Sequence, residues 1–210
     1  MYIDDSVEVK RPLIYWRELL HEWTFMVHRV YRVSGKSNSV HAEKERANTG
    51  LLAAAATRTG WVALEESSVE KTDKYSAKLT YSGHCDLVLW RDKRHHEIEA
   101  KVTRPSLSSR STNKLNKAHM KALSDSSRST KAGLRSEKKI GITYAIPHMK
   151  PRALSLLSED DIATKLLALI AEIRATHKPT ILAYAFPGPI KMVKSKNIGV
   201  GVILIGNITA

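Results

Sequence analysis

Two acids and a lysine in the middle of the chain are residue types suited to phosphate chemistry. Asp86 lies in the apolar run 84–90, and Glu99 and Lys101 lie in the segment 96–102, where polar and apolar residues alternate. Side chains two apart on a β-strand point to the same face, so Glu99 and Lys101 share one. If a tight turn joins the two segments, Asp86 falls beside Glu99 on the neighbouring strand. Two carboxylates so placed can share a Mg²⁺ or Mn²⁺ ion, because these hard cations prefer oxygen ligands.

A divalent cation in that position supplies what phosphodiester hydrolysis needs. It can hold a phosphate, lower the pKa of a bound water and offset charge on the leaving oxygen. The acid-x-Lys tripeptide alone is weak evidence, since it occurs at 8–10, 99–101 and 137–139. Only the second copy lies on an alternating strand that follows an apolar strand carrying an acid. The alternative is that its charged residues form the solvated face of an edge hairpin.

The rest of the chain predicts the elements that would position these residues. Apolar residues recur at steps of three and four from 13 to 33, which indicates an amphipathic helix. Further helices are predicted over 40–57, over 113–123 and from 158 onward. Strands are predicted over 61–65, 75–80, 84–90, 96–102, 139–146, 181–186 and 200–205, with turns in the polar stretch 66–74. We therefore expect an α/β fold with a central mixed β-sheet flanked by helices.

Composition narrows the classes of protein to consider. The chain has 210 residues, of which 42% are hydrophobic, so it can bury a core and is not disordered. The single Cys85 excludes a disulfide scaffold and a Cys-rich zinc module, and fits a reducing compartment. Charged residues interrupt the apolar stretch 13–33, so it cannot cross a bilayer. We expect a cytoplasmic protein without a membrane partner.

Positive charge is concentrated in one part of the chain. The net charge is +13, and residues 104–139 contain ten Lys or Arg against two acids. Such a concentration is typical of nucleic-acid binding, and also of a solvated Ser-rich loop. Three lysines spaced by three and four residues would form one stripe along the helix 113–123. The candidate phosphate contacts are Lys114, Lys117 and Lys121 on this stripe, with Arg104 and Arg110 beside it.

The order of these elements resembles the PD-(D/E)xK nuclease superfamily, which includes many restriction enzymes, resolvases and repair nucleases. In that family a helix leads into three strands, with an acid on the second strand and acid-x-Lys on the third, and a helix and a strand follow. Residues 40–146 have this order, although Cys85 and not Pro precedes Asp86. The resemblance implies an αβββαβ restriction endonuclease-like core. We expect one domain over 1–210, with the core at about 38–147 and elaborations at 12–33 and 158–206.

The resemblance also implies roles for individual residues. Asp86, Glu99 and the carbonyl of Ala100 would be ligands of Mg²⁺ or Mn²⁺, and Lys101 would position or activate the attacking water. Many members of the family add a Glu from the leading helix. Both Glu43 and Glu45 are available, and Glu45 is preferred because it shares a helical stripe with Asn48 and Leu52.

The function implied is hydrolysis of DNA, most plausibly by an endonuclease that leaves a 5′ phosphate and a 3′ hydroxyl. Cutting both strands would usually need two active sites, so a homodimer is a reasonable expectation. The alternative is a catalytically inactive nuclease-like module that binds nucleic acid or a protein partner. Metal dependence separates the two, because the module would bind equally well in the presence of a chelator.

Overall fold

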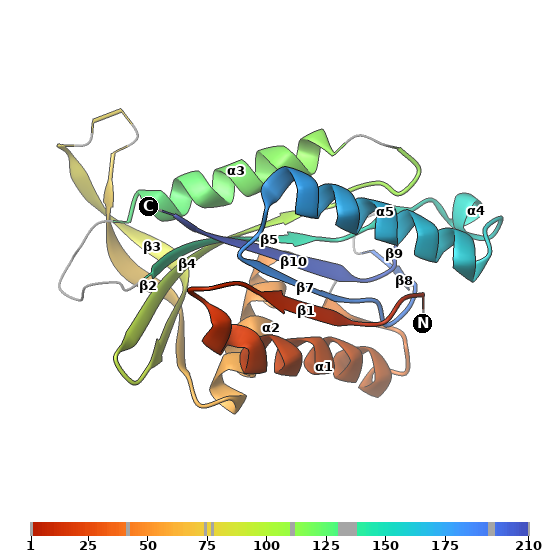
Figure 1. Ribbon diagram of the computed structural model, residues 1–210, viewed down its shortest axis with the longest axis horizontal. Coiled ribbons are helices and arrows are strands. Elements are labelled where there is room, and N and C mark those ends of the chain that lie inside the picture. The colour runs from red at the N-terminus through yellow and green to blue at the C-terminus, as the bar shows by residue number, and fades with distance from the viewer. Residues whose placement is uncertain are drawn as a thin grey trace.

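The chain folds around a seven-stranded mixed sheet with helices on both of its faces, as the computed structural model shows (Figure 1). Helices α1 (Arg17–Val33) and α2 (Glu45–Arg58) cover one face, and α3 (Asn113–Ser127) and α5 (Glu159–His177) cover the other. The expected α/β class with a flanked mixed sheet is confirmed. The structure describes residues 2–40, 43–73, 75–76, 78–109, 112–129, 138–192 and 196–209.

The large sheet has the strand order β1-β7-β10-β5-β4-β3-β2. Strands β2, β3 and β4 form an antiparallel meander, whereas β4 and β5 are parallel and are connected through α3. Its strands are β1 (Ser6–Val9), β2 (Val62–Thr72), β3 (Thr80–Arg91), β4 (Arg94–Thr103), β5 (Lys138–Ala145), β7 (Ile181–Ala185) and β10 (Val202–Thr209). A small second sheet contains β6 (His148–Met149), β9 (Ile198–Gly199) and β8 (Ile190–Lys191).

Two apolar layers hold the sheet between its helices. The amphipathic stripe of α1, which follows the 3₁₀ turn η1 (Ile14–Trp16), buries Leu20, Trp23 and Val27 against α2 and one sheet face. On the other face, α5 buries residues such as Leu166. Helix α5 begins with a capping box at its first turn. The short helix α4 (Pro151–Leu154) precedes it. No helix in the described part of the chain is long and apolar enough to span a membrane.

Strand β3 leaves β4 partway along its length. The β3–β4 pairs run from Arg91↔Arg94 at the turn to Leu87↔Ile98. Beyond that pair β3 continues with β2 as a two-stranded ribbon that projects from the sheet (Figure 1). The rest of β4 pairs with β5 on its other side, from Glu99↔Gly141 to Thr103↔Ala145. The departure leaves one edge of β4 without a strand beside it.

The projecting ribbon corrects several predictions. The polar stretch 66–72, predicted as turns, belongs to β2, and the predicted strand 75–80 contributes only Thr80 to β3. Most side chains of β2 in this ribbon are exposed or partly exposed, so the strand needs no apolar alternation and its sequence does not have the pattern of a half-buried strand. The helix predicted over 40–57 begins at Glu45. Strands β1, β6, β8 and β9 and helix α4 were also missed, because very short elements leave little periodicity.

Candidate active site

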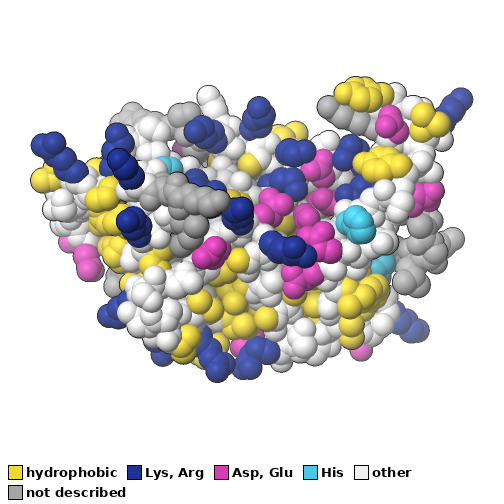
Figure 2. Space-filling model, turned by 180° about the vertical axis from the view of Figure 1, so that it is seen from behind, with side chains coloured by type: hydrophobic (Ala, Val, Ile, Leu, Met, Phe, Trp, Pro, Cys, Tyr) yellow, Lys and Arg dark blue, Asp and Glu magenta, His cyan; other side chains and the backbone are white. Residues whose placement is uncertain are grey.

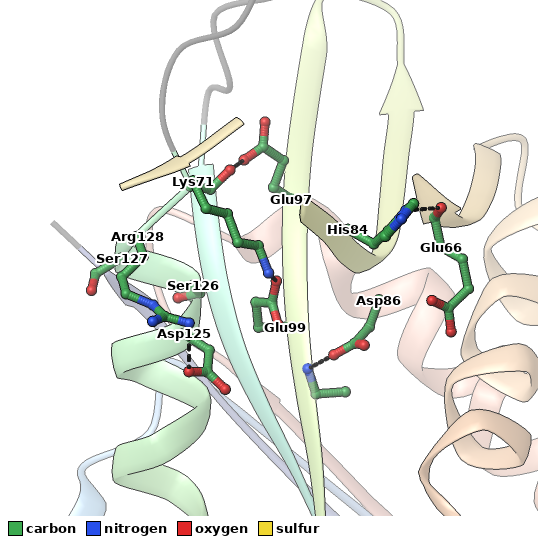
Figure 3. A network of polar contacts seen from close by, with 12 residues as sticks. Glu66, Lys71, His84, Asp86, Glu97, Glu99, Asp125, Ser126, Ser127 and Arg128 are labelled. Carbon is green, nitrogen blue, oxygen red and sulfur yellow. Dashed lines mark hydrogen bonds and ion pairs between the residues drawn. The ribbon is translucent and has the colours of Figure 1, made fainter. Parts of the chain in front are cut away.

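Asp86 lies where β3 and β4 separate. Its Oδ2 accepts a hydrogen bond of 2.6 Å from the Ala100 amide, on the edge of β4 that β3 has left (Figure 3). A buried main-chain amide that loses its strand partner needs another acceptor, and the carboxylate supplies one. The Asp86 side chain keeps 25% of its surface exposed. It is therefore both anchored to the sheet and accessible.

The carboxylate of Glu45 also accepts a hydrogen bond from a main-chain amide of β4, two residues beyond Ala100. The Val102 amide donates to Glu45 Oε2 at 3.1 Å, because amides two residues apart face the same edge of a strand. Glu45 is the first residue of α2, which brings its side chain down to this edge. Glu43 precedes the helix, and its main-chain carbonyl accepts from Arg104 at 3.1 Å. Of the two helix candidates, Glu45 is the one brought to the site.

Lys101 is the centre of the cluster. Its ammonium lies 3.6 Å from Glu45 Oε1, and 3.8 Å from both Asp86 Oδ2 and Asp125 Oδ2. It also donates a hydrogen bond to the Ala100 carbonyl oxygen. The Lys101 side chain is 19% exposed. Side chains from α2, β3, β4 and α3 thus converge on one cation.

Asp125 is a member of this cluster that the sequence analysis missed. It lies in the last turns of α3 and also pairs with Lys121 at 3.2 Å and Arg128 at 3.4 Å. Its side chain is only 14% exposed. An available signal was that Asp125 is one of only two acids among the ten basic residues of 104–139.

Glu99 has a different partner on the other side of β4. Its Oε1 lies 2.5 Å from the ammonium of Lys71, a residue of β2 that sequence reasoning did not single out. Figure 3 shows Lys71 and Glu99 to one side of β4 and Asp86 to the other. The β3–β4 register ends at the Leu87↔Ile98 pair, so Asp86 and Glu99 come directly after the last paired residues, where the two strands separate. The two carboxylates nevertheless make separate contacts.

The acids on this side of β4 are buried, which contradicts the alternative of a solvated hairpin face. Glu97 and Glu99 are 7% and 5% exposed. Glu97 accepts a hydrogen bond from Ser129, just beyond α3. The end of α3 and the end of β2 therefore cover the acids that alternate along β4.

Burial shifts the pKa values of several of these groups. It raises the pKa of Glu99, and the hydrogen bond and charge of Lys71 oppose that rise. It also raises the pKa of Glu45, against the attraction of Lys101. Burial raises the pKa of the Cys85 thiol to about 12, so this thiol is not a nucleophile at neutral pH.

A small acidic cavity adjoins Asp86. Its volume is about 40 Å³, and its lining includes Glu45, Glu65, Glu66 and Asp86. Glu65 and Glu66 were not predicted, because they lie where the sequence analysis ended one strand and expected turns. Glu66 has a positive φ of 52°, and its carbonyl lies 3.2 Å from His84 Nδ1. The β2 strand thus adds two acids to the surroundings of Asp86.

The donor set suits a hard cation, although its carboxylates are dispersed. Among the described residues, no three Asp, Glu, His or Cys side chains are grouped so that they could hold a metal ion. The oxygens that do converge are those of Asp86, Glu45 and the Ala100 carbonyl, and a cationic ammonium already lies against them. Oxygen donors of this kind fit Mg²⁺ or Mn²⁺. Glu99 would complete the set only by leaving Lys71.

The predicted phosphate contacts are partly placed around the site. Lys114 and Lys117 are exposed on α3, opposite its buried residues Leu115 and Ala122. Lys121 belongs to the same stripe and pairs with Asp125. Figure 2 shows acidic side chains gathered near the middle of one face, with Lys and Arg side chains around them. Arg104 is tied to the segment before α2, and Arg110 lies outside the described residues.

The site therefore combines partly exposed carboxylates around Lys101, where β3 leaves β4, with the buried Lys71–Glu99 ion pair on the α3 side of β4. Comparison of the chain with protein-family models, with curated proteins and with solved structures finds no match.

Proposed function

We propose that this chain is a metal-dependent nuclease of the PD-(D/E)xK type that acts on DNA as an endonuclease. One observation carries the proposal. The Lys101 ammonium lies within 4 Å of Asp86 and Glu45 and contacts the Ala100 carbonyl, at the edge of β4 that β3 has left. The acid of the second strand, the x-Lys of the third and the helix Glu of the family pattern thus meet at one point.

The topology supports the same proposal. The elements α2, β2, β3, β4, α3 and β5 follow one another as helix, three antiparallel strands, helix and parallel strand. Asp86 lies on the second of the three strands, and Glu99 and Lys101 lie on the third. We take these elements as the restriction endonuclease-like αβββαβ core within residues 38–147.

The residues divide the work as follows. Asp86, Glu45, Glu99 and the Ala100 carbonyl would hold Mg²⁺ or Mn²⁺, which when bound supplies Lewis acidity and a more acidic water. Lys101 donates hydrogen bonds to the attacking water and to the phosphate oxygens, where charge grows in the transition state. Water attacks phosphorus, the bond to the 3′ oxygen breaks, and a 5′ phosphate remains. The exposed lysines of α3 would hold the DNA backbone beside this site.

A second candidate function is favoured by one specific contact. Lys71 holds Glu99 in a buried ion pair, so the acid of the acid-x-Lys motif already has a cation. A nuclease-like module that binds nucleic acid without cutting it would keep such a pair permanently. The net charge of +13 serves DNA binding in either case.

Incubation of the protein with circular and linear DNA tests the proposal. The arms contain Mg²⁺, Mn²⁺ or EDTA, and the variants are Asp86→Asn, Lys101→Met and Lys10→Met. Lys10 is the matched control, because it ends another acid-x-Lys copy and is exposed. It follows β1, at the opposite edge of the sheet from the β2–β3 pair. We expect metal-dependent cleavage that Lys101→Met lowers at least about 100-fold, as for loss of one transition-state donor, and that Lys10→Met leaves unchanged.

Two outcomes would count against the nuclease. Cleavage by Lys101→Met at the wild-type rate would exclude the role given to this lysine. Intact DNA in every metal, with salt-sensitive binding that persists in EDTA, would favour the binding module. If DNA is cut, opening of the circle separates an endonuclease from an exonuclease.

A further inference from the structure

The buried contact between β2 and β4 is unusual for a lysine. Lys71 and Glu99 have side chains that are 9% and 6% exposed, and their charged atoms lie 2.5 Å apart. Removing two charges from water is unfavourable, so such a pair persists only where the surrounding structure holds it in place. The contact is therefore a built feature of the fold.

Three features build it. Residue Thr72 donates its amide to the Arg128 carbonyl at 2.8 Å, and Lys71 forms a β-bridge with Ser129, so the end of β2 is fastened to the end of α3. The aliphatic stem of Lys71 passes over Gly83 of β3, where a Cβ would lie 3.0 Å from the lysine Cδ. The ribbon and α3 together direct one ammonium onto Glu99.

The contact explains why the carboxylates of the site are dispersed. The pairing of β3 with β4 ends at Leu87↔Ile98, just before Asp86 and Glu99, and Glu99 lies on the α3 side of β4, where its carboxylate contacts Lys71 (Figure 3). Asp86, in contrast, faces the open edge with Lys101. The charges of Asp86 and Lys101 act on the pKa of Glu99, so the three groups are near enough to interact. Movement of the Glu99 carboxylate toward Asp86 would leave Lys71 as a buried, unpaired cation, which is unfavourable.

We propose that Lys71 is a built-in counter-ion that keeps Glu99 apart from Asp86, and that a divalent cation takes Glu99 from Lys71 and so loosens the end of β2 from α3. The inference rests on the proposed function, since it concerns the same metal site. A cation of charge two attracts a carboxylate more strongly than an ammonium does at similar distance. Lys71, on its flexible stem, then moves toward water, and the strand end that carries it follows.

Hydrogen exchange of the Thr72 amide in the wild-type protein is the first test. Mn²⁺ would broaden the signals of nearby amides, so exchange is followed by NMR with saturating Mg²⁺ or with EDTA. We expect the Thr72 amide to exchange at least about tenfold faster with Mg²⁺, because its bond to Arg128 opens more often. Glu99→Gln should remove this response. An unchanged or slower exchange in Mg²⁺ would overturn the proposal.

Metal affinity of Lys71→Gln gives the second test. Binding of Mn²⁺, measured by calorimetry at constant pH, should be about tenfold tighter in this variant, because a competing positive charge is gone while an amide donor to Glu99 remains. Lys78→Gln is the matched control, since it removes an exposed lysine from the same ribbon. Equal or weaker affinity in a folded Lys71→Gln protein would contradict the proposal.

The hydrogen-exchange and metal-affinity measurements also distinguish failure of this inference from failure of the proposed function. If Mn²⁺ binds and Asp86→Asn abolishes binding, but the Thr72 amide is indifferent to metal, the metal site stands and the role of Lys71 falls. If the wild-type protein binds neither Mn²⁺ nor Mg²⁺, both fall together. The exchange measurement needs no variant at Lys71, so it holds even if that substitution prevents folding.

Discussion

The two sides of strand β4 place similar side chains in different surroundings. At the edge that β3 has left, the side chains of Glu45, Asp86 and Lys101 are 36%, 25% and 19% exposed, and the Lys101 ammonium lies 3.6 Å from Glu45 and 3.8 Å from Asp86. On the α3 side, the Lys71 and Glu99 side chains are 9% and 6% exposed, with charged atoms at 2.5 Å. Solvent reaches the first group, which we call the open side of β4. The second group is shielded from solvent, and we call it the closed side.

Glu99 and Lys101 reach different surroundings because their side chains differ in length, as well as because of the geometry of the strand. Glu99 and Lys101 alternate onto the same face of β4, as strand periodicity requires. Glu99 is short and stays under α3 and β2. Lys101 has a longer stem, so its ammonium bends round to the open edge and reaches the Ala100 carbonyl. An acid and a lysine of one tripeptide can therefore serve two regions.

The largest expected effect comes from breaking the closed pair. Lys71→Met leaves Glu99 as a buried carboxylate without its cation, and such a change typically lowers the free energy of unfolding by about 3–5 kcal/mol. Lys101→Met is the comparison on the open side, where screened pairs contribute about 1 kcal/mol or less. Urea denaturation of both variants measures the difference. Equal losses for the two lysines would show that the sides are energetically alike.

A double substitution sharpens this prediction. Lys71→Met with Glu99→Met replaces the pair by apolar side chains, which is often neutral for stability. We expect the double variant to recover most of the stability that Lys71→Met loses. If it is no more stable than the single variant, the loss comes from packing of the lysine stem and not from the stranded charge.

A second prediction concerns the pH dependence of stability, which depends on exclusion of water from the α3 side of the sheet. His119 is buried on α3, and its ring nitrogens contact Thr143 Oγ1 at 3.1 Å and Asn207 Oδ1 at 3.2 Å. Burial, first, and the neighbouring His177 lower its pKa to about 4. The unfolded chain takes up this proton near pH 6.5. The stability due to neutral His119 is thus complete above pH 6.5 and lost as the pH falls toward 4.

The variant His119→Gln measures this contribution. Between pH 7 and pH 4.5 the wild-type protein should lose about 2 kcal/mol more stability than the variant, because the variant has no ring to protonate. Thermal or urea unfolding at the two pH values gives the comparison. Parallel loss in both proteins would mean that water reaches this side of β4 and that His119 titrates normally there.

How far the sequence predicted the site depends on the kind of signal. Strand alternation and the short turn predicted Asp86 beside Glu99 near one end of the strand pair. The observed pairs end at Leu87↔Ile98, just before these two residues, and the two carboxylates contact different lysines. The α/β class and the order of the helices and the main strands followed from periodicity as well. These features depend on neighbours within about twenty residues, which local patterns encode.

The missed residues depend on contacts that local patterns do not encode. Lys71 lies in a ribbon that was predicted as turns, and its partner is fixed only when β2 crosses to α3. Asp125 lies beyond the predicted end of its helix, in a segment whose composition suggested only positive charge. The partner of a buried charge is set by which distant element passes over it, and one sequence does not show that.

Substitution of Asp125 should have the smallest of these effects on stability. This residue of α3 reaches the lysine at the open edge of β4 and also pairs with two basic residues at the end of its own helix. It reaches Lys101 from α3 at 3.8 Å and also pairs with Lys121 and Arg128. Asp125→Asn removes the charge but keeps the shape, and we expect a loss of about 1 kcal/mol in low salt. High salt screens the exposed Lys121, so the loss of stability should be smaller in high salt.

Asp92→Asn is the control. The Asp92 side chain is 74% exposed and pairs with Arg94, so we expect no measurable loss of stability. A loss for Asp125→Asn that salt does not change would assign Asp125 to the closed side, with Lys101 as its dominant partner.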